Sequence, residues 1–339
     1  MKKYKTKKHL SLNIAENENW SNGHKKQVRT YRNTNNNWRN ELDKLNNDKR
    51  MQKLFQYSFE GNKKMVKALL NGAQDGFDIN FKDSDENTAL MYSIKGGNIE
   101  TIKFLIAKGA EINYLNNLEL SPLHLAVRKN RFDIVSALVD NGALLNIRGR
   151  FGETPIFDAV GEGNAKMVEA LHLNGADINV KNAKGDTPLL IAVKSPKSQE
   201  CALTLLALGA NIEERNDNGQ TPLIYAIHYK NNIMIDILLK RGSDMNRADA
   251  FGNTPIMYCA KTGNREALRV LIARGANFQC KNSAGKDALD IAKESGFNGC
   301  AEILAKANRI MLSDMSDMDK KQALKEFAAH NRITNSCVR

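Results

Sequence analysis

The sequence predicts an all-α solenoid, a stack of short helix pairs rather than a domain with one core. Three observations support this prediction. A helix-start signal of Thr or Ser followed by Pro returns at steps of 33 or 34 residues, a glycine returns in phase with it, and aliphatic residues between the two have helical spacing. A fixed period in this range indicates stacked supersecondary units, each burying its apolar side against its neighbours.

The period is visible in the seven helix-start triplets. Five of the six prolines of the chain occupy the second position of such a triplet. The triplets begin at Thr88, Ser121, Thr154, Thr187, Thr221, Thr254 and Asp287. The glycines in phase with them are Gly109, Gly142, Gly175, Gly209, Gly242 and Gly275.

Each recurring residue has a physical role in the clearest copy of the repeat. The Thr154 hydroxyl is expected to accept a free backbone N–H, and Pro155 occupies the first helical position, where no donor is needed. Gly163 and Gly175 are expected to end two successive helices in the left-handed conformation. Gly152 is expected to form the tip of a hairpin turn. One unit is therefore predicted to be a turn and two antiparallel helices.

The pattern G-x-T-P-L-x-x-A-x-x-x-G, followed by paired aliphatic residues and G-A-x-I-N, resembles the ankyrin repeat. The resemblance covers residues 51–305 in seven in-phase copies, after an atypical first unit at 51–81 that we interpret as an N-terminal cap. It implies a solenoid whose hairpin tips and first helices line a concave binding face, and it implies no reaction. It also implies that His124 bonds to neighbouring backbone.

Charge divides the chain into three predicted parts. The arm at residues 1–50 holds 13 Lys and Arg against 5 Asp and Glu, the array at 51–305 holds 30 against 29, and the tail at 306–339 holds 7 against 4. Most of the net charge of +12 therefore lies in the arm. Its low hydrophobicity predicts that it is mostly disordered, with a lead-in helix after Glu41.

The basic arm has two interpretations. It is either a solvated tail of biased composition, or a segment at residues 1–40 that contacts nucleic acid or an acidic surface through its cations and its aromatic residues, Trp20 and Trp38 among them.

The tail at residues 306–339 is predicted to contain a short helix over residues 317–330. This helix begins behind Ser316 or Asp317 and carries Leu324, Phe327 and Ala328 on one face. It is expected to cover the final repeat. The alternative is a detachable helix that binds a partner.

Several positions depart from the repeat. Glu86 and Glu119 occupy the slot of the turn glycine, so we expect distorted turns there. Pro196 and Lys230 replace the glycine that ends a first helix. We therefore expect a remodelled loop around Pro196 and left-handed strain at Lys230.

No pattern in the chain predicts catalysis. The five cysteines form no C-x-x-C pair and are expected to be reduced core thiols. No P-loop, H-E-x-x-H motif, metal cluster or nucleophile elbow is present. We therefore predict no enzyme activity, no cofactor and no metal. The absence of an 18-residue apolar run and of a signal sequence predicts a cytoplasmic chain with no membrane span.

One surface position of the repeat, which we call a slot, predicts the charge of the partner. The residue two before the glycine that ends each first helix is expected to face the concave side, and in this array the slot is mostly basic. It holds Lys95, Arg128, Gly161, Lys194, His228 and Lys261, which we call the basic ladder. The ladder favours an acidic, extended partner, although polar residues there are often only solvated. Because these positions lie outside the apolar slots, we expect their replacement by Glu to leave the fold intact.

Exposed apolar side chains at the tips add candidate anchors, because aromatic residues dominate binding energy at interfaces. These candidates are Leu118, Phe151, Phe251 and Tyr229. The sequence therefore predicts a monomeric, non-enzymatic protein-interaction module. One alternative is a nucleic-acid-associated regulator that uses the basic arm. Another is an enzyme whose repeats recognise the substrate, which the lack of a spare globular domain argues against.

Overall fold

The computed structural model describes residues 47–71 and 78–333, which are helical apart from turns and one isolated antiparallel bridge between Lys82 and Thr88. The chain divides into two compact units, residues 1–143 and 144–339, which are described separately. The predicted disorder of the basic arm and its contacts with nucleic acid concern residues before Asn47, outside the described ranges.

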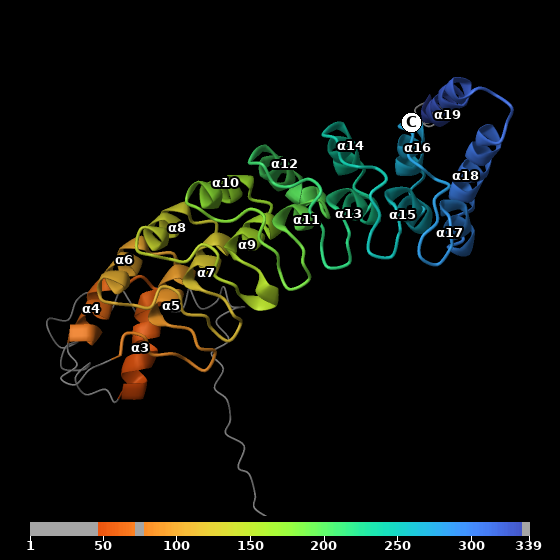
Figure 1. Ribbon diagram of the computed structural model, residues 1–339. Helices are drawn as coiled ribbons and strands as arrows, with labels where there is room; N and C mark the ends of the chain where they lie inside the picture. Colours follow the sequence, from red (N-terminus) through yellow and green to blue (C-terminus); the bar gives the residue numbers. More distant parts are fainter. Residues whose placement is uncertain (1–46, 72–77, 334–339) are drawn as a thin grey trace, which may run out of the picture. The chain divides into compact units, whose positions relative to one another are not determined.

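In the unit of residues 1–143, the described residues form three helix pairs. They are α3 (Asn47–Phe59) with α4 (Lys63–Asn71), α5 (Ala89–Gly96) with α6 (Ile99–Ala107), and α7 (Pro122–Arg128) with α8 (Phe132–Val139). The first helices α3, α5 and α7 pack side by side, as do the second helices α4, α6 and α8 (Figure 1). Helix α3 is the first helix of the atypical first unit, and the burial of Leu54 and Val66 confirms the frame predicted for that unit. Most of the lead-in helix predicted after Glu41 concerns residues outside the described ranges.

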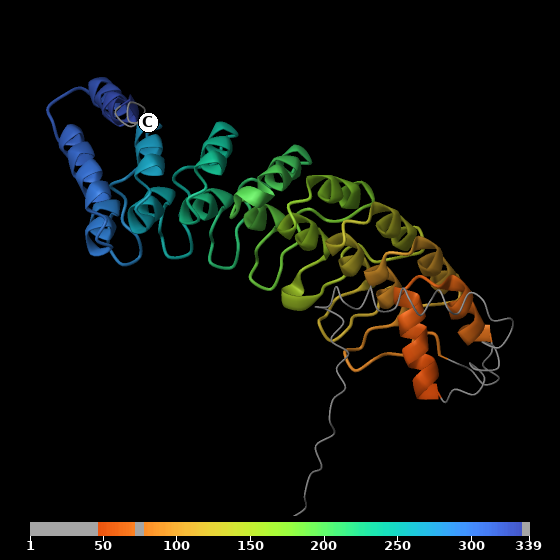
Figure 2. The same ribbon diagram turned by 180° about the vertical axis from the view of Figure 1, so that it is seen from behind.

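In the unit of residues 144–339, the part that the structure describes, up to residue 333, forms five more pairs and a last helix. They are α9 (Pro155–Gly161) with α10 (Ala165–Leu173), α11 (Pro188–Ala192) with α12 (Gln199–Ala207), α13 (Pro222–His228) with α14 (Asn232–Lys240), α15 (Pro255–Thr262) with α16 (Arg265–Ala273), α17 (Ala288–Glu294) with α18 (Asn298–Met311), and α19 (Asp317–Ile333). The first helices form one row with the hairpins beside them, and the second helices form another (Figure 2). We call the first side the hairpin side and the second the outer side.

The predicted helix ends are mostly confirmed. The hydroxyls of Thr88, Ser121, Thr187 and Thr221 accept the N–H of the residue three positions on, at 3.2–3.4 Å. Gly163 and Gly175 are left-handed, with φ of 71° and 102°. The prediction is wrong for Thr154, whose hydroxyl is buried and bonds to no other described residue.

His124 and Ser121 form a capping box, as the resemblance implied. The Ser121 backbone N–H donates to Nδ1 of His124 at 3.2 Å, and the His124 N–H donates to the Ser121 hydroxyl, also at 3.2 Å. The Ser121 hydroxyl oxygen also lies 2.8 Å from Nδ1. Two backbone donors at the helix start are thereby satisfied.

The hairpins are fixed by Asp or Asn side chains and by each other. Asp83, for example, accepts the backbone N–H groups of Asp85 and Asn87 at 2.9 and 2.7 Å. The same pair of bonds recurs at Asn116, Asn182, Asn216, Asp249 and Asn282. Successive hairpins of residues 144–339 are joined by single backbone bonds, such as the one from Ser283 N–H to the Phe251 carbonyl at 3.0 Å. The tips are therefore held in place.

The expectation of distorted turns at Glu86 and Glu119 is wrong. Both residues keep the left-handed conformation of the glycine they replace, with φ of 59° and 56°. Their backbone N–H groups donate to the backbone carbonyls of Asp83 at 3.0 Å and of Asn116 at 2.7 Å, which is the hydrogen bond that closes the turn in the glycine-containing hairpins. The hydrogen bonds that fix each hairpin keep the turn in its regular shape. The two glutamates therefore carry backbone strain, and the turns are not distorted.

The predicted irregularity around Pro196 and Lys230 is confirmed. Helix α11 has only five residues, and a 3-10 turn at Pro196–Ser198 follows it. The Ser198 hydroxyl donates to the Val160 carbonyl at 2.8 Å, which ties the remodelled loop to the preceding repeat. Lys230 has φ of 56°, in the left-handed region.

The C-terminal helix α19 packs on α16 and α18. Ser316 caps it as predicted, because its hydroxyl accepts the Asp319 N–H at 3.2 Å. Leu324 and Ala328 are buried and Phe327 is half-buried, so the predicted apolar face is the one that contacts the array. Helix α18 continues to Met311 and so runs through the predicted array boundary at 305/306.

Candidate partner-binding surface

The candidate residues fall in both units. Lys95, Leu118 and Arg128 lie within residues 1–143, and the others lie within residues 144–339. In the described part of the chain, no three His, Cys, Asp or Glu side chains are grouped so as to hold a metal ion. No helix there is both long enough and apolar enough to cross a bilayer.

Three of the four cysteines in the described ranges are core thiols. Cys201, Cys259 and Cys300 are fully buried, whereas Cys280 is half-buried, and all four are free. Burial raises the pKa of the Cys201 thiol to about 11 and also raises the pKa of Cys259 and Cys300. A raised pKa suppresses the reactive thiolate, so these side chains pack as small apolar residues.

Lys95 is half-buried rather than free on the surface. Its Nζ donates to Oδ1 of Asn87 at 2.9 Å and lies 5.2 Å from the centre of the Tyr92 ring. Burial lowers the pKa of Lys95, against the attraction of the nearby Asp83 and Asp85 carboxylates. In the same unit Arg128 is exposed, and Leu118 is 57% exposed at a hairpin tip.

Lys194 is held by a buried carboxylate and two aromatic rings. Its Nζ lies 3.5 Å from Asp186, whose side chain is only 2% exposed. The same Nζ lies 4.9 and 5.7 Å from the ring centres of Tyr225 and Tyr229, a cation–π arrangement. Asp186 also accepts bonds from the Tyr225 hydroxyl at 2.6 Å and from the Asn216 amide at 3.1 Å.

His228 and Tyr229 extend this arrangement toward the next repeat. The His228 ring is edge-on to Tyr229, with centroids 5.0 Å apart, and lies 6.3 Å from Tyr258. The Tyr258 hydroxyl donates to Asp249 at 2.7 Å; burial first, and this bond second, raise the pKa of Tyr258 to about 12. We call the group Lys194, Tyr225, His228, Tyr229 and Tyr258 the aromatic cluster.

Only part of the aromatic cluster is accessible. Tyr229 is 48% exposed and His228 is exposed, whereas Tyr225 and Tyr258 are buried beneath them. Lys261, in the slot of Lys194 and His228 one repeat further on, is also exposed. The hairpin side of α11, α13 and α15 therefore presents one fixed cation, one exposed cation and two exposed rings.

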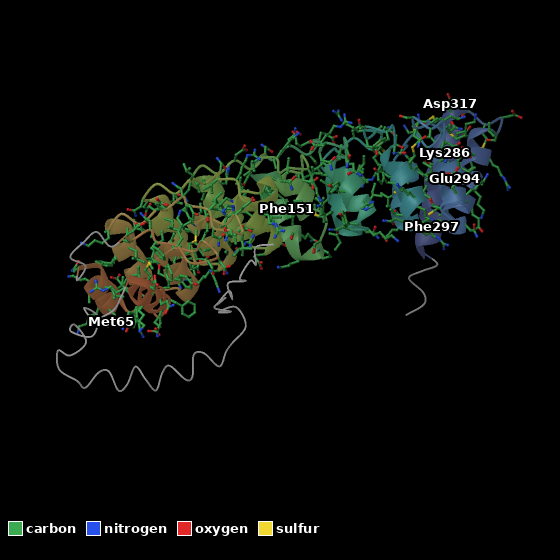
Figure 3. The ribbon with its side chains drawn as sticks, turned by 90° about the horizontal axis from the view of Figure 1, so that it is seen from below. Met65, Phe151, Lys286, Glu294, Phe297 and Asp317 are labelled. Atoms are coloured by element: carbon green, nitrogen blue, oxygen red, sulfur yellow. The ribbon has the colours of Figure 1, made fainter. Side chains whose placement is uncertain are left out.

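The basic ladder is not a row of equivalent free charges. In two repeats the ladder lysine contacts the residue eight positions earlier, in the pairs Asn87–Lys95 and Asp186–Lys194. The last repeat reverses the polarity of this pair, because Lys286 contacts Glu294 at 2.7 Å (Figure 3). The eight-residue spacing was visible in the sequence and would have revealed these pairs.

Sequence reasoning also missed the tyrosines that bond to hairpin carboxylates. Tyr92 and Tyr258 each donate to the Asp nine residues earlier, Asp83 and Asp249. Tyr225 instead donates to Asp186 of the preceding repeat and receives a bond from Asn216 at 3.0 Å. These buried bonds link the first helices to the hairpins, and the nine-residue spacing of Asp or Asn to Tyr is their signal.

Phe151 and Phe251 are exposed at hairpin tips, as predicted. Their side chains are 60% and 61% exposed, while their backbone carbonyls accept bonds from the following hairpins. Two further hairpins, with Lys184 and Asn218 at the corresponding positions, separate them. The structure therefore does not bring the two rings together.

Comparison with known proteins agrees with this architecture. The family described as ankyrin repeats (3 copies) matches residues 54–149, 156–249 and 230–319. The chain belongs to the ankyrin-repeat family, whose members serve in general as non-enzymatic scaffolds for protein–protein interaction. No curated protein matches the chain.

Among solved structures, the chain is similar to the crystal structure of the ankyrin repeat domain of Bcl-3, described as a unique member of the IkappaB protein family. The two share 28% sequence identity with a TM-score of 0.58, over 66% of this chain and 100% of that one. The prediction of an all-α ankyrin solenoid is confirmed.

Proposed function

We propose that this chain is a cytoplasmic, monomeric adaptor that binds an acidic, extended segment of a partner protein on the hairpin side of its array. The observation that supports this most directly is the aromatic cluster. It combines a lysine already fixed by surrounding groups with an exposed tyrosine and an exposed histidine.

The fixed position of Lys194 favours binding of a carboxylate. A long flexible lysine normally loses rotamer freedom when it forms an ion pair, whereas Lys194 is already ordered between two rings and Asp186. About a quarter of its side chain, 26%, remains exposed, so that a partner's carboxylate can reach it. Lys261 adds a second cation one repeat away.

Aromatic side chains supply the apolar contacts of the proposed surface. Tyr229 lies within the aromatic cluster, and Phe251 stands at a tip on the next hairpin. Phe151 provides a separate anchor further along the unit. In residues 1–143, we assign Arg128, Leu118 and the partly accessible Lys95 to partner binding as well.

A crosslinking pull-down followed by mass spectrometry, with and without nuclease, tests the proposal. The bait variants are Tyr229→Ala, Phe251→Ala and Lys261→Glu, and the matched control is Lys166→Glu, an exposed lysine on the outer helix α10. We expect the three variants, but not the control, to lose the same nuclease-resistant protein. If one partner binds the three variants and the control equally well, the binding site does not lie on the hairpin side.

The charge of the basic arm favours a second candidate function, nucleic-acid binding through residues 1–40. Each phosphate neutralised by a cation releases counterions, so affinity for a DNA or RNA duplex should fall steeply as salt rises. A chain starting at Glu41 should lose this binding. Binding that is absent, or independent of salt, would leave only the protein partner.

A further inference from the structure

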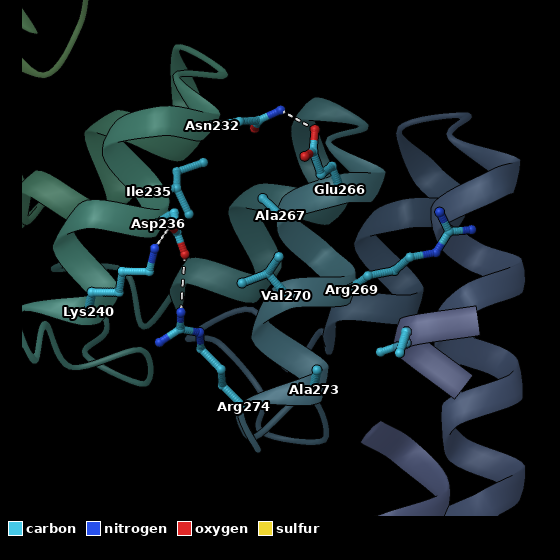
Figure 4. Close-up of a pocket in the computed structure, with 12 residues that line it drawn as sticks. Asn232, Ile235, Asp236, Lys240, Glu266, Ala267, Arg269, Val270, Ala273 and Arg274 are labelled. Atoms are coloured by element: carbon cyan, nitrogen blue, oxygen red, sulfur yellow. Dashed lines mark hydrogen bonds and ion pairs between the residues drawn. The ribbon is translucent and has the colours of Figure 1, made fainter. Parts of the chain in front are cut away.

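A groove lies on the outer side of residues 144–339, between α14, α16 and the C-terminal helix α19. Its volume is about 690 Å³. Residues of α14 and α16 line most of the groove (Figure 4), and Ala328 and Ala329 of α19 complete the lining. The groove is distinct from the aromatic cluster, which lies on the first helices.

The floor of the groove is made of small and aliphatic side chains. Ile235 and Ala267 are almost fully buried, whereas Val270 and Ala273 are half-buried and so partly open to the groove. Small residues let another backbone approach closely. This floor therefore suits a helix better than an extended chain, which would need a free strand edge for its hydrogen bonds.

The rim charges of the groove are paired with one exception. The Asp236 carboxylate forms ion pairs with Lys240 at 2.6 Å and with Arg274 at 3.2 Å. The Asn232 amide donates a hydrogen bond to Glu266 at 2.6 Å (Figure 4). Arg269 forms no hydrogen bond or ion pair with another described residue, and its Nε is shielded from solvent. The side chain points away from Asp236, toward the C-terminal helices (Figure 4).

The array already docks one helix beside this groove. Helix α19 packs on α16 and α18, with Leu324 and Ala328 buried and Lys325 and Glu326 exposed. The groove continues the same outer surface, over α16 between α14 and α19. A second helix placed there would bury the floor and contact Ala328 and Ala329.

We propose that the groove between α14, α16 and α19 binds an amphipathic helix of a partner protein, and that a carboxylate on this helix pairs with Arg269. Charge complementarity selects an acidic helix, because the lining holds three cations, Lys240, Arg269 and Arg274, against two carboxylates. The aliphatic face of the helix covers Val270 and Ala273.

The probe for this proposal is a display library of helical peptides about four turns long. Each peptide carries aliphatic residues at i, i+4, i+7 and i+11, with Glu, Gln or Lys at a neighbouring position. The full-length chain serves as bait. We expect Glu peptides to be enriched, and enrichment of Lys peptides or of none would overturn the proposal.

The selected Glu peptide and its Gln counterpart are then titrated against variants by fluorescence anisotropy. Ala273→Arg should weaken the Glu peptide about tenfold or more by filling the groove, whereas Ala207→Arg, in the same slot of α12 but outside the groove, should not. Arg269→Gln should weaken the Glu peptide about fivefold or more and leave the Gln peptide unchanged. If Arg269→Gln weakens both peptides equally, the proposed ion pair between Arg269 and the peptide carboxylate is refuted.

Two controls keep these outcomes interpretable. Ala329→Arg alters an exposed wall residue, so it tests the groove even if Ala273→Arg fails to fold. Tyr229→Ala should leave peptide binding unchanged, since it changes the other surface. Sedimentation equilibrium on the chain without peptide addresses a second copy as occupant, and self-association abolished by Ala329→Arg would refute the partner helix.

Discussion

Replacing Lys194 with Glu should destabilise the chain, whereas the same replacement at Lys261 should not. The two lysines occupy the same slot in different repeats. Lys194 is next to the buried Asp186 carboxylate, at 3.5 Å, whereas Lys261 is exposed. The expectation from the sequence that ladder residues can be reversed without cost therefore does not extend to Lys194.

The size of the effect follows from the burial of the pair. Loss of the lysine leaves Asp186 with its bonds from Tyr225 and Asn216 but without a countercharge. For a pair with one partner a quarter exposed, we expect a cost of about 1–2 kcal/mol, below the range for fully buried pairs. A second carboxylate nearby adds roughly 1–2 kcal/mol of repulsion at the effective dielectric of a protein surface.

Thermal unfolding of the full chain, followed by circular dichroism, measures this difference. A cost of about 2–4 kcal/mol in a unit of 150–250 residues lowers the melting temperature by roughly 4–16 °C. Lys261→Glu should change the melting temperature by little, as surface substitutions usually do. Equal melting temperatures for the two variants, in low and in high salt, would refute the structural role assigned to Asp186–Lys194.

Three further predictions concern stability. Tyr258→Phe should make the stability of the chain fall less steeply above pH 10. The pKa of Tyr258 is raised from 10.0 to about 12 in the folded chain. The protonated tyrosine therefore contributes its full stabilisation below pH 10, and this stabilisation is lost as the pH rises through 12. Melting curves of both proteins from pH 9 to 12 measure this, and parallel curves would contradict it. Lys230→Gly should raise stability by about 0.5–1 kcal/mol, since glycine removes the left-handed strain but gains entropy in the unfolded chain. Lys230→Ala keeps the strain and is its control. Deleting residues 1–38 should leave the melting temperature of the array nearly unchanged, and a large decrease would mean that Trp20 or Trp38 packs on the repeats.

Much of the fold was predictable because each repeat carries its own local signals. The Thr-Pro caps, the left-handed glycines and the aliphatic spacing each act within a few residues, so they specify a helix pair without knowledge of its neighbours. The turns at Glu86 and Glu119 were not predictable in this way. Bonds from Asp83 and Asn116 outweigh the conformational preference of glutamate there.

The candidate site was less predictable than the fold. The register correctly identified exposed positions such as Tyr229, Phe151 and Phe251. It did not show that Lys194 is compensated by Asp186, because that pair depends on how deeply the hairpin base is buried. The groove beside α19 depends on where the tail helix packs, and a helical pattern in the tail does not state which repeat it will contact.

The burial of Asp186 determines how binding experiments on this surface must be read. Loss of binding in Lys194→Glu would combine a lost contact with a damaged hairpin, because the lysine serves the fold as well as the proposed partner. Tyr229 and Lys261 are exposed, so their variants remove contacts while leaving the buried bonds of Tyr225 and Tyr258 in place. Binding lost in those two variants at an unchanged melting temperature therefore assigns the partner to the hairpin side.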